Sequence, residues 1–280
     1  MAPHETTLAY LGLISLGFIV ASYGTIVGAA GGFLYVPLLL LLYPRDHHST
    51  LTAIALAVNF FTSISGMTAY ARQKRIDYKS GWWFAAVTIP GAILGVIATT
   101  LIARKSFEGI FSVFLIGLAL FMLFRPKSDT GPTGEKRLPA TGGVTRVFHS
   151  LNGITFEFHY SRILGLAVFF VLGFVVSFLG IGGGALIMPT LSYVVNFPVF
   201  IATGTSIFIV TIITFTASLV NIFHGAFHHG AHRIAALAIG ALIGSQVGGY
   251  LSKKIKGAWV IRALAIAIAV TGVKMLLDVI

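Results

Sequence analysis

Two glycine-rich stretches are the part of this sequence best suited to binding a ligand. They are Gly28-Ala29-Ala30-Gly31-Gly32 and Gly180-Ile181-Gly182-Gly183-Gly184, and a proline follows each one at the same distance, as Pro37 and Pro189. Both lie in long apolar segments, where a broken helix leaves unpaired N–H groups and a positive dipole end that can hold an anion. We therefore expect contacts with substrate from Gly28, Gly31, Gly32, Gly180, Gly182, Gly183 and Gly184, and structural roles for Pro37 and Pro189.

Hydroxyl and amide side chains follow each glycine run: Thr52 and Asn59 in the first half, and Thr203, Thr205 and Ser206 in the second. Neutral donors of this kind, combined with backbone N–H groups, suit a small oxyanion better than a cation. Two alternatives stay open, because a hydroxyl can bond the backbone of its own helix and glycines can simply allow close helix packing. The favoured prediction adds these five residues to the glycines as the substrate site.

The acidic residues do not suggest a cation pathway. None of the eight Asp and Glu lies at the centre of an apolar stretch, whereas ion and proton pathways in membranes are commonly built on buried carboxylates. His224 could exchange a proton near neutral pH and is the candidate for proton coupling. The chain has no cysteine, and it has no hydrolase triad, phosphate-binding loop or dinucleotide fingerprint in a suitable context. We expect no enzyme activity, no cofactor and no bound metal.

A histidine cluster suggests a different function. His224, His228 and His232 recur every four residues, so on a helix they would share one face and could chelate a divalent metal. Gly225 and Gly230 favour a loop instead. A transition-metal permease or sensor is therefore the alternative to an anion transporter, and a passive channel is a third possibility.

The composition indicates a membrane protein. Of the 280 residues, 56% are hydrophobic and 10% are charged, whereas soluble domains carry about 25% charged residues. The formal charge of +11 does not indicate nucleic acid here, because Lys and Arg lie almost wholly in short breaks between apolar stretches. We expect an all-α polytopic membrane protein whose partners are the lipid bilayer and a small anion, with self-association left open.

Eight apolar stretches can be drawn along the chain, at 7–43, 50–71, 81–103, 107–124, 163–197, 199–223, 234–251 and from 258 onward. Two of them, 7–43 and 163–197, greatly exceed the roughly 20 residues of a single span. These two contain the glycine runs. Each must therefore break, fold back or cross twice.

The chain also contains an internal repeat. Besides the glycine and proline stretches, Thr50-Leu51-Thr52-Ala53 matches Thr203-Gly204-Thr205-Ser206, and Gly91-Ala92-Ile93-Leu94-Gly95 matches Gly240-Ala241-Leu242-Ile243-Gly244. Each copy begins with a glycine-broken segment and continues with three further spans. We expect a first membrane repeat, a linker and a second membrane repeat at residues 1–124, 125–161 and 162–280.

The placement of charge favours an inverted orientation of the two repeats. If both long segments fold back at their glycines, the Lys and Arg of the loops divide 13 against 4, and if each crosses once they divide 11 against 6. Cytoplasmic loops are enriched in Lys and Arg, so the cleaner division is the expected one. It predicts a cytoplasmic linker and an inverted repeat, with the parallel arrangement as the alternative.

The linker carries a hairpin signal. Apolar and polar residues partly alternate from Val144 to His159 on both sides of Asn152-Gly153, and Asn-Gly is a strong indicator of a tight β-turn. We expect a small cytoplasmic hairpin packed on the membrane domain. A regulatory or partner-binding flap is the alternative.

From Gly28 to Pro37, from Gly180 to Pro189 and at Ala202-Thr203-Gly204-Thr205-Ser206, the sequence resembles the TauE/SafE family of sulfite exporters. The resemblance covers nearly the whole chain. It implies a multi-pass permease of the bacterial inner membrane that exports sulfite, an organosulfonate or a related sulfur-containing anion. The first copy departs from the family pattern at Ala29-Ala30 and at Leu51-Thr52-Ala53. We therefore expect the second half to supply more of the ligand contacts, with the anion bound between the two broken segments.

Overall fold

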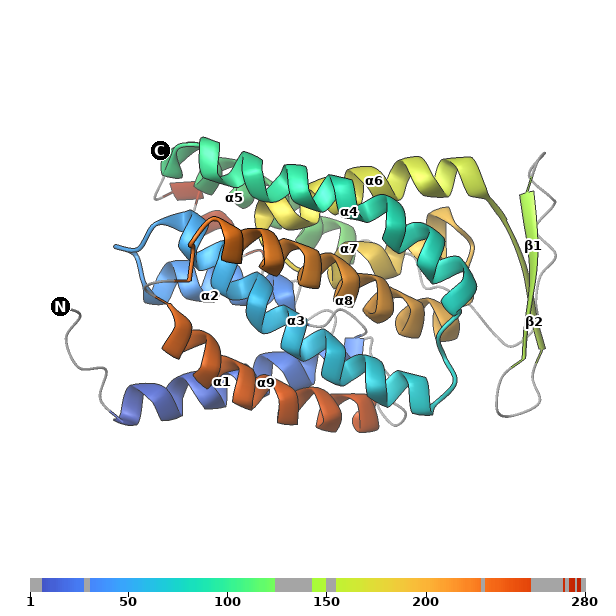
Figure 1. The fold of residues 1–280 in the computed structure, drawn as a ribbon, viewed down its shortest axis with the longest axis horizontal. Helices are drawn as coiled ribbons and strands as arrows, with labels where there is room; N and C mark the ends of the chain where they lie inside the picture. The colour runs from blue at the N-terminus through green and yellow to red at the C-terminus, as the bar shows by residue number, and fades with distance from the viewer. Residues whose placement is uncertain are drawn as a thin grey trace.

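Long helices lie side by side along one axis in the computed structural model (Figure 1). The structure describes residues 7–27, 31–123, 143–149, 155–227, 230–252, 269, 272–274 and 276–277. The helices of the first half are α1 (Thr7–Val27), α2 (Gly32–Leu42), α3 (His48–Arg72), α4 (Tyr78–Leu101) and α5 (Arg104–Leu123). Those of the second half are α6 (Arg162–Leu179), α7 (Gly184–Pro189), a π-helical turn (Thr190–Val194), α8 (Val199–Phe223) and α9 (Ala231–Leu251).

Six of the described helices are long and apolar enough to cross a membrane, namely α1, α3, α4, α6, α8 and α9. The helix α2 and the continuous stretch of α7 and its π-helical turn are apolar but shorter. Their length fits a helix that begins inside the membrane rather than at its surface. The prediction of an all-α polytopic membrane protein is confirmed.

Both glycine runs end a helix and start another. Gly31 precedes α2 with φ 78°, and Gly183 precedes α7 with φ 81°. These two residues occupy the same position in the two copies, six residues before Pro37 and Pro189. A left-handed conformation at this point strongly favours glycine. The residue before α2 and the residue before α7 therefore share one backbone conformation.

The helices of the two halves are interlocked. Gly240 of α9 lies against Ile14 and Phe18 of α1, and Gly248 lies against Ser22. In the same way Gly91 of α4 lies against Phe170 of α6, and Gly95 lies against Phe174 and Phe178. In each pair the residue numbers rise together, so the paired helices are parallel. Each pair joins the first helix of one copy to the helix that carries the repeated Gly-x-x-x-Gly sequence in the other, and glycine lets their backbones approach closely.

The direction of each helix follows from such contacts. We call the end of the bundle with His48, Thr99 and Asn221 the His48 end, and the opposite end, with Tyr70 and Tyr160, the Tyr160 end. The helices α1, α3 and α9 run from the His48 end to the Tyr160 end, and α4, α6 and α8 run the other way. The pairs α1 and α6, α3 and α8, and α4 and α9, which correspond in sequence, therefore run in opposite directions. These directions support the inverted repeat.

A two-stranded antiparallel sheet lies within the linker, at the Tyr160 end (Figure 1). Its strands are β1 (Gly143–His149) and β2 (Thr155–Ser161), and they flank the Asn-Gly pair, which is outside the described residues. The Tyr160 hydroxyl lies 3.0 Å from the Ser80 hydroxyl, and its ring packs on Phe84 and Phe197. The hairpin is thus attached to the start of α4 and to the loop before α8. The limits of the three parts of the chain and the cytoplasmic location of the linker stay predictions.

The pairing of α1 with α9 can be tested by cross-linking, because the chain has no native cysteine. Thr25 Oγ1 and Ser245 Oγ lie 2.9 Å apart between these helices. The Thr25→Cys/Ser245→Cys variant should form an intramolecular disulfide under mild oxidation, detected by a shift in gel mobility. The Thr25→Cys/Thr88→Cys variant, with its second cysteine on α4, should not. Equal cross-linking in both would contradict the pairing.

Candidate functional site

The two helix breaks meet inside the bundle against α3. A Cβ at Gly32 would lie 2.7 Å from the Asn59 amide nitrogen and would collide with the Ile181 carbonyl oxygen. A Cβ at Gly182 would also collide with the Asn59 amide, and one at Gly180 would lie 2.8 Å from Thr52 Cβ. The backbones of both breaks therefore approach each other, and Asn59 lies at the junction. Only glycine leaves room for that approach.

Asn59 is completely buried, and neither its Nδ2 nor its Oδ1 has a hydrogen-bond partner in the described part of the chain. Leaving a buried polar group unpaired costs about 1–3 kcal/mol. An apolar residue at this position would avoid that cost. The unpaired amide therefore points to a ligand or water that pairs with it during function.

Backbone donors lie at the starts of α2 and α7, next to the same junction. The N-caps of α2 and α7 are glycines without a side chain to accept a hydrogen bond. In the first turns the N–H of Leu34 bonds the Gly31 carbonyl at 3.0 Å, and those of Leu186 and Ile187 bond the Gly183 carbonyl at 3.0 and 2.8 Å. The N–H groups of the residues that precede these in each helix have no intrahelical acceptor. The breaks can thus offer backbone donors alongside the amide.

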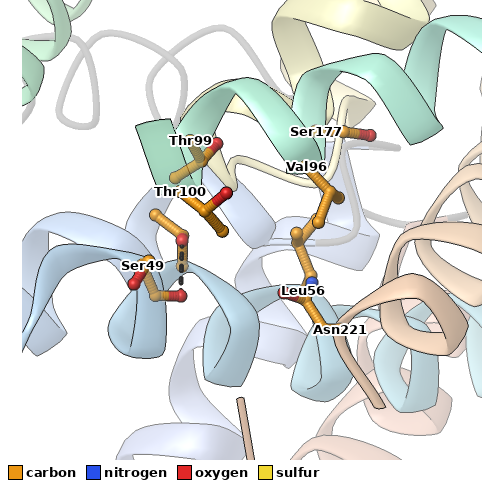
Figure 2. Close-up of a pocket in the computed structure, with 8 residues that line it drawn as sticks. Ser49, Leu56, Val96, Thr99, Thr100, Ser177 and Asn221 are labelled. Carbon is orange, nitrogen blue, oxygen red and sulfur yellow. Dashed lines mark hydrogen bonds between the residues drawn. The ribbon is translucent and has the colours of Figure 1, made fainter. Parts of the chain in front are cut away.

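A small hollow lies near the His48 end, and Figure 2 shows the residues that line it. Its empty volume, which includes open solvent, is about 180 Å³. Uncharged residues of α3, α4, α6 and α8 line it: Ser49, Thr52, Leu56, Val96, Thr99, Thr100, Ser177 and Asn221. The lining is uncharged, and in this conformation the space between these side chains is too narrow to hold a water molecule.

The hollow and the junction are separated by apolar side chains. Leu56 and Val96 line the hollow, are almost fully buried and pack with Ala217 in a small cluster of their own. On α3, Leu56 lies between Thr52 and Asn59, which the helical spacing places on one face. Leu56 therefore lies between the residue that contacts Gly180 and the one that contacts Gly182.

The structure brings together part of the predicted site. Gly32, Thr52, Asn59, Gly180 and Gly182 converge as described above. The hydroxyl of Thr52 donates to the Ser49 carbonyl at 2.9 Å, so its oxygen is left to accept. Gly31, Gly183 and Gly184 form the starts of α2 and α7 beside this junction. Gly28 lies outside the described residues.

Three other predicted residues make different contacts. Thr203 Oγ1 donates to the Phe200 carbonyl and Ser206 Oγ to the Thr203 carbonyl, at 3.0 and 2.9 Å. Thr205 Oγ1 accepts the Asp77 N–H at 3.0 Å, near the Tyr160 end. The first two hydroxyls are thus bonded to their own helix, and the third joins α8 to the start of α4. Their contact with substrate stays a prediction.

The histidine cluster does not lie on one helix. The helix α8 ends at Phe223 and α9 begins at Ala231, with Gly225 at φ 69° between them. His224 is exposed, with Nδ1 2.9 Å from the Val220 carbonyl oxygen, and His232 meets the Tyr10 ring edge-on. His228 is outside the described residues, and among those described no three His, Asp or Glu could hold one metal ion. The shared helical face that the metal hypothesis needs is therefore missing, and proton coupling by His224 stays a prediction.

Some site residues were not predicted. Ser177 is almost fully buried, its hydroxyl has no partner in the described structure, and it lines the hollow. Its place three residues before the second glycine run is a usable signal. The sequence contains no signal that identifies Leu56, Val96 or Thr99 as site residues, because apolar residues and threonine are common in any span.

Helices that break in the membrane interior and meet at a buried, unpaired amide are typical of a polytopic membrane transporter. The chain belongs to the sulfite exporter TauE/SafE family, whose model matches residues 13–275. It is 28% identical to the probable membrane transporter protein YunE of Bacillus subtilis over 97% of this chain and 98% of that one. It is 22% identical to the probable membrane transporter protein YjnA of the same organism over 94% and 98%. No solved structure matches the chain.

The close approach at Gly182 can be tested by substitution. Gly182 has φ 66° and its Cα faces the Asn59 amide. A left-handed alanine costs about 1–2 kcal/mol, so Gly182→Ala, with its added collision, should lower the Tm in detergent by at least about 2 °C. Gly117→Ala is the control, because no atom lies within 4 Å of the added carbon and α5 is helical there. An equal Tm for the two variants would refute the close approach.

The barrier formed by Leu56 can be tested by cysteine accessibility. A thiol-reactive alkylsulfonate should label Thr52→Cys, which lines the hollow, faster than Asn59→Cys, which lies behind Leu56. Leu56→Ala should raise the labelling rate of Asn59→Cys by at least about tenfold, because the lost side chain leaves a gap that water can enter. Leu51→Ala, an equally buried leucine of α3 in another cluster, is the matched control. If Leu51→Ala has the same effect, Leu56 is not the barrier.

Proposed function

We propose that this chain is a secondary transporter that exports a small sulfur-containing oxyanion, such as sulfite or an organosulfonate. The substrate site is the junction of the two helix breaks, formed by Gly32, Asn59, Gly180 and Gly182 with the first N–H groups of α2 and α7. The observation that carries the proposal is the Asn59 amide, which is fully buried and unpaired at that junction. Membership of a family named for sulfite export supports the choice of substrate.

The chemistry of the junction favours an anion over a cation. The amide nitrogen and helix N-termini present N–H groups and the positive ends of two helix dipoles. A hard divalent metal ion such as Ca²⁺ or Mg²⁺ would instead need several oxygen ligands, typically with carboxylates among them. No carboxylate lines the hollow or contacts the junction in the described part of the chain. The organosulfonates share the oxyanion head, so this chemistry accommodates both named substrates.

The distribution of charge supports an orientation in the inner membrane. The loops at the His48 end carry Arg45, Arg104, Lys105 and Arg233 as their Lys and Arg. Arg104 donates to the Asp46 carbonyl at 2.7 Å, and Arg233 forms an ion pair with the Asp46 carboxylate. The Tyr160 end, with the linker, is much richer in Lys and Arg, so it is the cytoplasmic end. The hollow then lies on the outer side, where an exit for an exported anion would form when the site opens.

The opposite directions of corresponding helices support alternating access. In inverted-repeat transporters, two conformations related by the repeat expose one central site to either side. Here the second copy reaches the junction through Gly180 and Gly182, and the first through Gly32. The hollow at the His48 end then marks the place of one of two exits, and its counterpart would open at the Tyr160 end when the repeats exchange conformations.

The proposal is tested by flux and stability measurements on the same variant. Asn59→Leu should lower sulfite flux from proteoliposomes by at least about tenfold yet leave the Tm equal or higher, because it removes an unpaired buried amide. Thr211→Val is the control, since that hydroxyl bonds the Ile207 carbonyl of its own helix. The flux through Thr211→Val should change less than about threefold if the loss of transport is specific to Asn59.

Two outcomes would overturn the proposal. One is an absence of sulfite and sulfonate flux under any imposed gradient by protein that remains folded. The other is a normal flux through Asn59→Leu, which would place the substrate elsewhere.

A further inference from the structure

The amide at the junction needs two kinds of partner. Whichever way the Asn59 side chain is turned, it presents an amide N–H₂ that donates and a carbonyl oxygen that accepts. Both atoms are buried and unpaired in the described structure. An ordinary oxyanion, which only accepts, would pair with the nitrogen and leave the oxygen unsatisfied. A ligand that satisfies the whole amide must also donate a hydrogen.

A second acceptor lies at the same junction. The Ile181 carbonyl oxygen of the second copy faces Gly32 so closely that a Cβ there would collide with it, and the Asn59 amide faces Gly32 from the same copy as that glycine. The Thr52 hydroxyl already donates to Ser49, which leaves its oxygen to accept. The junction therefore combines donors from Asn59 and the helix starts with acceptors from Asn59, Ile181 and Thr52. It is not a cluster of donors alone.

The junction also lacks formal charge. The side-chain atoms nearest to a Cβ at Gly32, Gly180 or Gly182 in the described structure belong to Asn59 and Thr52, and the side chains that line the adjoining hollow are all uncharged. The cost of removing an ion from water rises with the square of its charge. Dipoles and N–H groups can offset that cost for one negative charge more readily than for two.

We propose that this junction binds sulfite as hydrogen sulfite, the monoanion that still carries an acid hydrogen, and rejects the dianion. This inference rests on the proposed function and adds the protonation state of the substrate. The O–H of the ligand donates to Asn59 Oδ1 or to the Ile181 carbonyl. Its remaining oxygens accept from Asn59 Nδ2 and from the backbone N–H groups. A dianion would set its lone pairs against both carbonyl oxygens.

The consequence for transport is that a proton travels with the anion. A substrate that binds only in its protonated form takes that hydrogen across the membrane without a titrating side chain in the site. Export would then respond to pH through the ligand itself. No buried carboxylate is needed for that response.

The test is an equilibrium binding titration with the full chain in detergent, where no gradient acts. Sulfite affinity is measured by calorimetry between about pH 6 and about pH 8, and the apparent Kd should rise about tenfold per pH unit above the pKa of the ligand's own acid hydrogen. Methanesulfonate is the control, because it is a monoanion without an acid hydrogen over this whole range. It should bind more weakly than sulfite at the lower pH, with a Kd independent of pH, and sulfate should not compete.

Other results overturn the inference. A sulfite Kd that is constant or improves as pH rises would show that the dianion binds. The same pH slope for methanesulfonate as for sulfite would show that a protein group titrates instead. Asn59→Leu, whose fold is monitored by its Tm, should lose the preference for sulfite over methanesulfonate, and retention of that preference would also refute the role of the amide. If no sulfur anion binds the folded chain at any pH, the proposed function itself fails.

Discussion

The structure depends on one constraint: unwound backbone inside an apolar membrane domain has to be enclosed by protein. The chain interrupts a helix twice in its interior, at Gly31 and at Gly183. It encloses these breaks by bringing them against each other and against α3, with glycine at each point of contact. The contacts that cover the breaks are therefore the same contacts that form the site. The requirement to cover the two breaks creates the junction at which Asn59 lies.

The interlocking of the two halves supports this junction from both sides. The first helix of each copy packs on a Gly-x-x-x-Gly helix of the other, so neither half can enclose its break alone. The two groups of helices that result, α1 with α3 and α9, and α4 with α6, differ in the bonds between their helices. In α1, α3 and α9, Ser245 Oγ bonds the Thr62 carbonyl at 2.7 Å and Tyr70 Oη the Thr25 carbonyl at 2.9 Å. Between α4 and α6 the described residues show one such bond, from Thr99 Oγ1 to the Phe178 carbonyl at 2.7 Å, together with a stacked pair, Phe84 and Phe169. The group of α4 and α6 has fewer directional contacts to break if helices slide during transport.

Much of the fold could be predicted from local pattern. The apolar stretches predict the spans, the glycine runs predict the breaks at Gly31 and Gly183, and Asn-Gly predicts the hairpin between β1 and β2. These features depend on neighbouring residues or on a repeat visible along the chain. Gly240 and Gly244 even indicate a helix that packs closely, though not its partner, because the pairing with Ile14 and Phe18 is a contact between residues far apart in the sequence.

The site was predictable only in part, for the same reason. Asn59 and Thr52 stand out as polar residues in an apolar span, but the sequence does not distinguish them from Thr203 and Ser206, whose hydroxyls bond their own helix. The distinction depends on which break each helix face meets in three dimensions. The apolar barrier at Leu56 could not be predicted from the sequence, because leucine is common in any membrane span.

The central claim is that the two breaks and Asn59 form the substrate site. A structure determined with a bromine-labelled alkylsulfonate tests it most directly, since the anomalous signal of bromine locates the ligand independently of its shape. The account predicts the sulfonate head within about 3 Å of the Asn59 amide nitrogen, between Gly32 and Gly182. A ligand found only at the Tyr160 end beside Thr205, or among the histidines after α8, would contradict it.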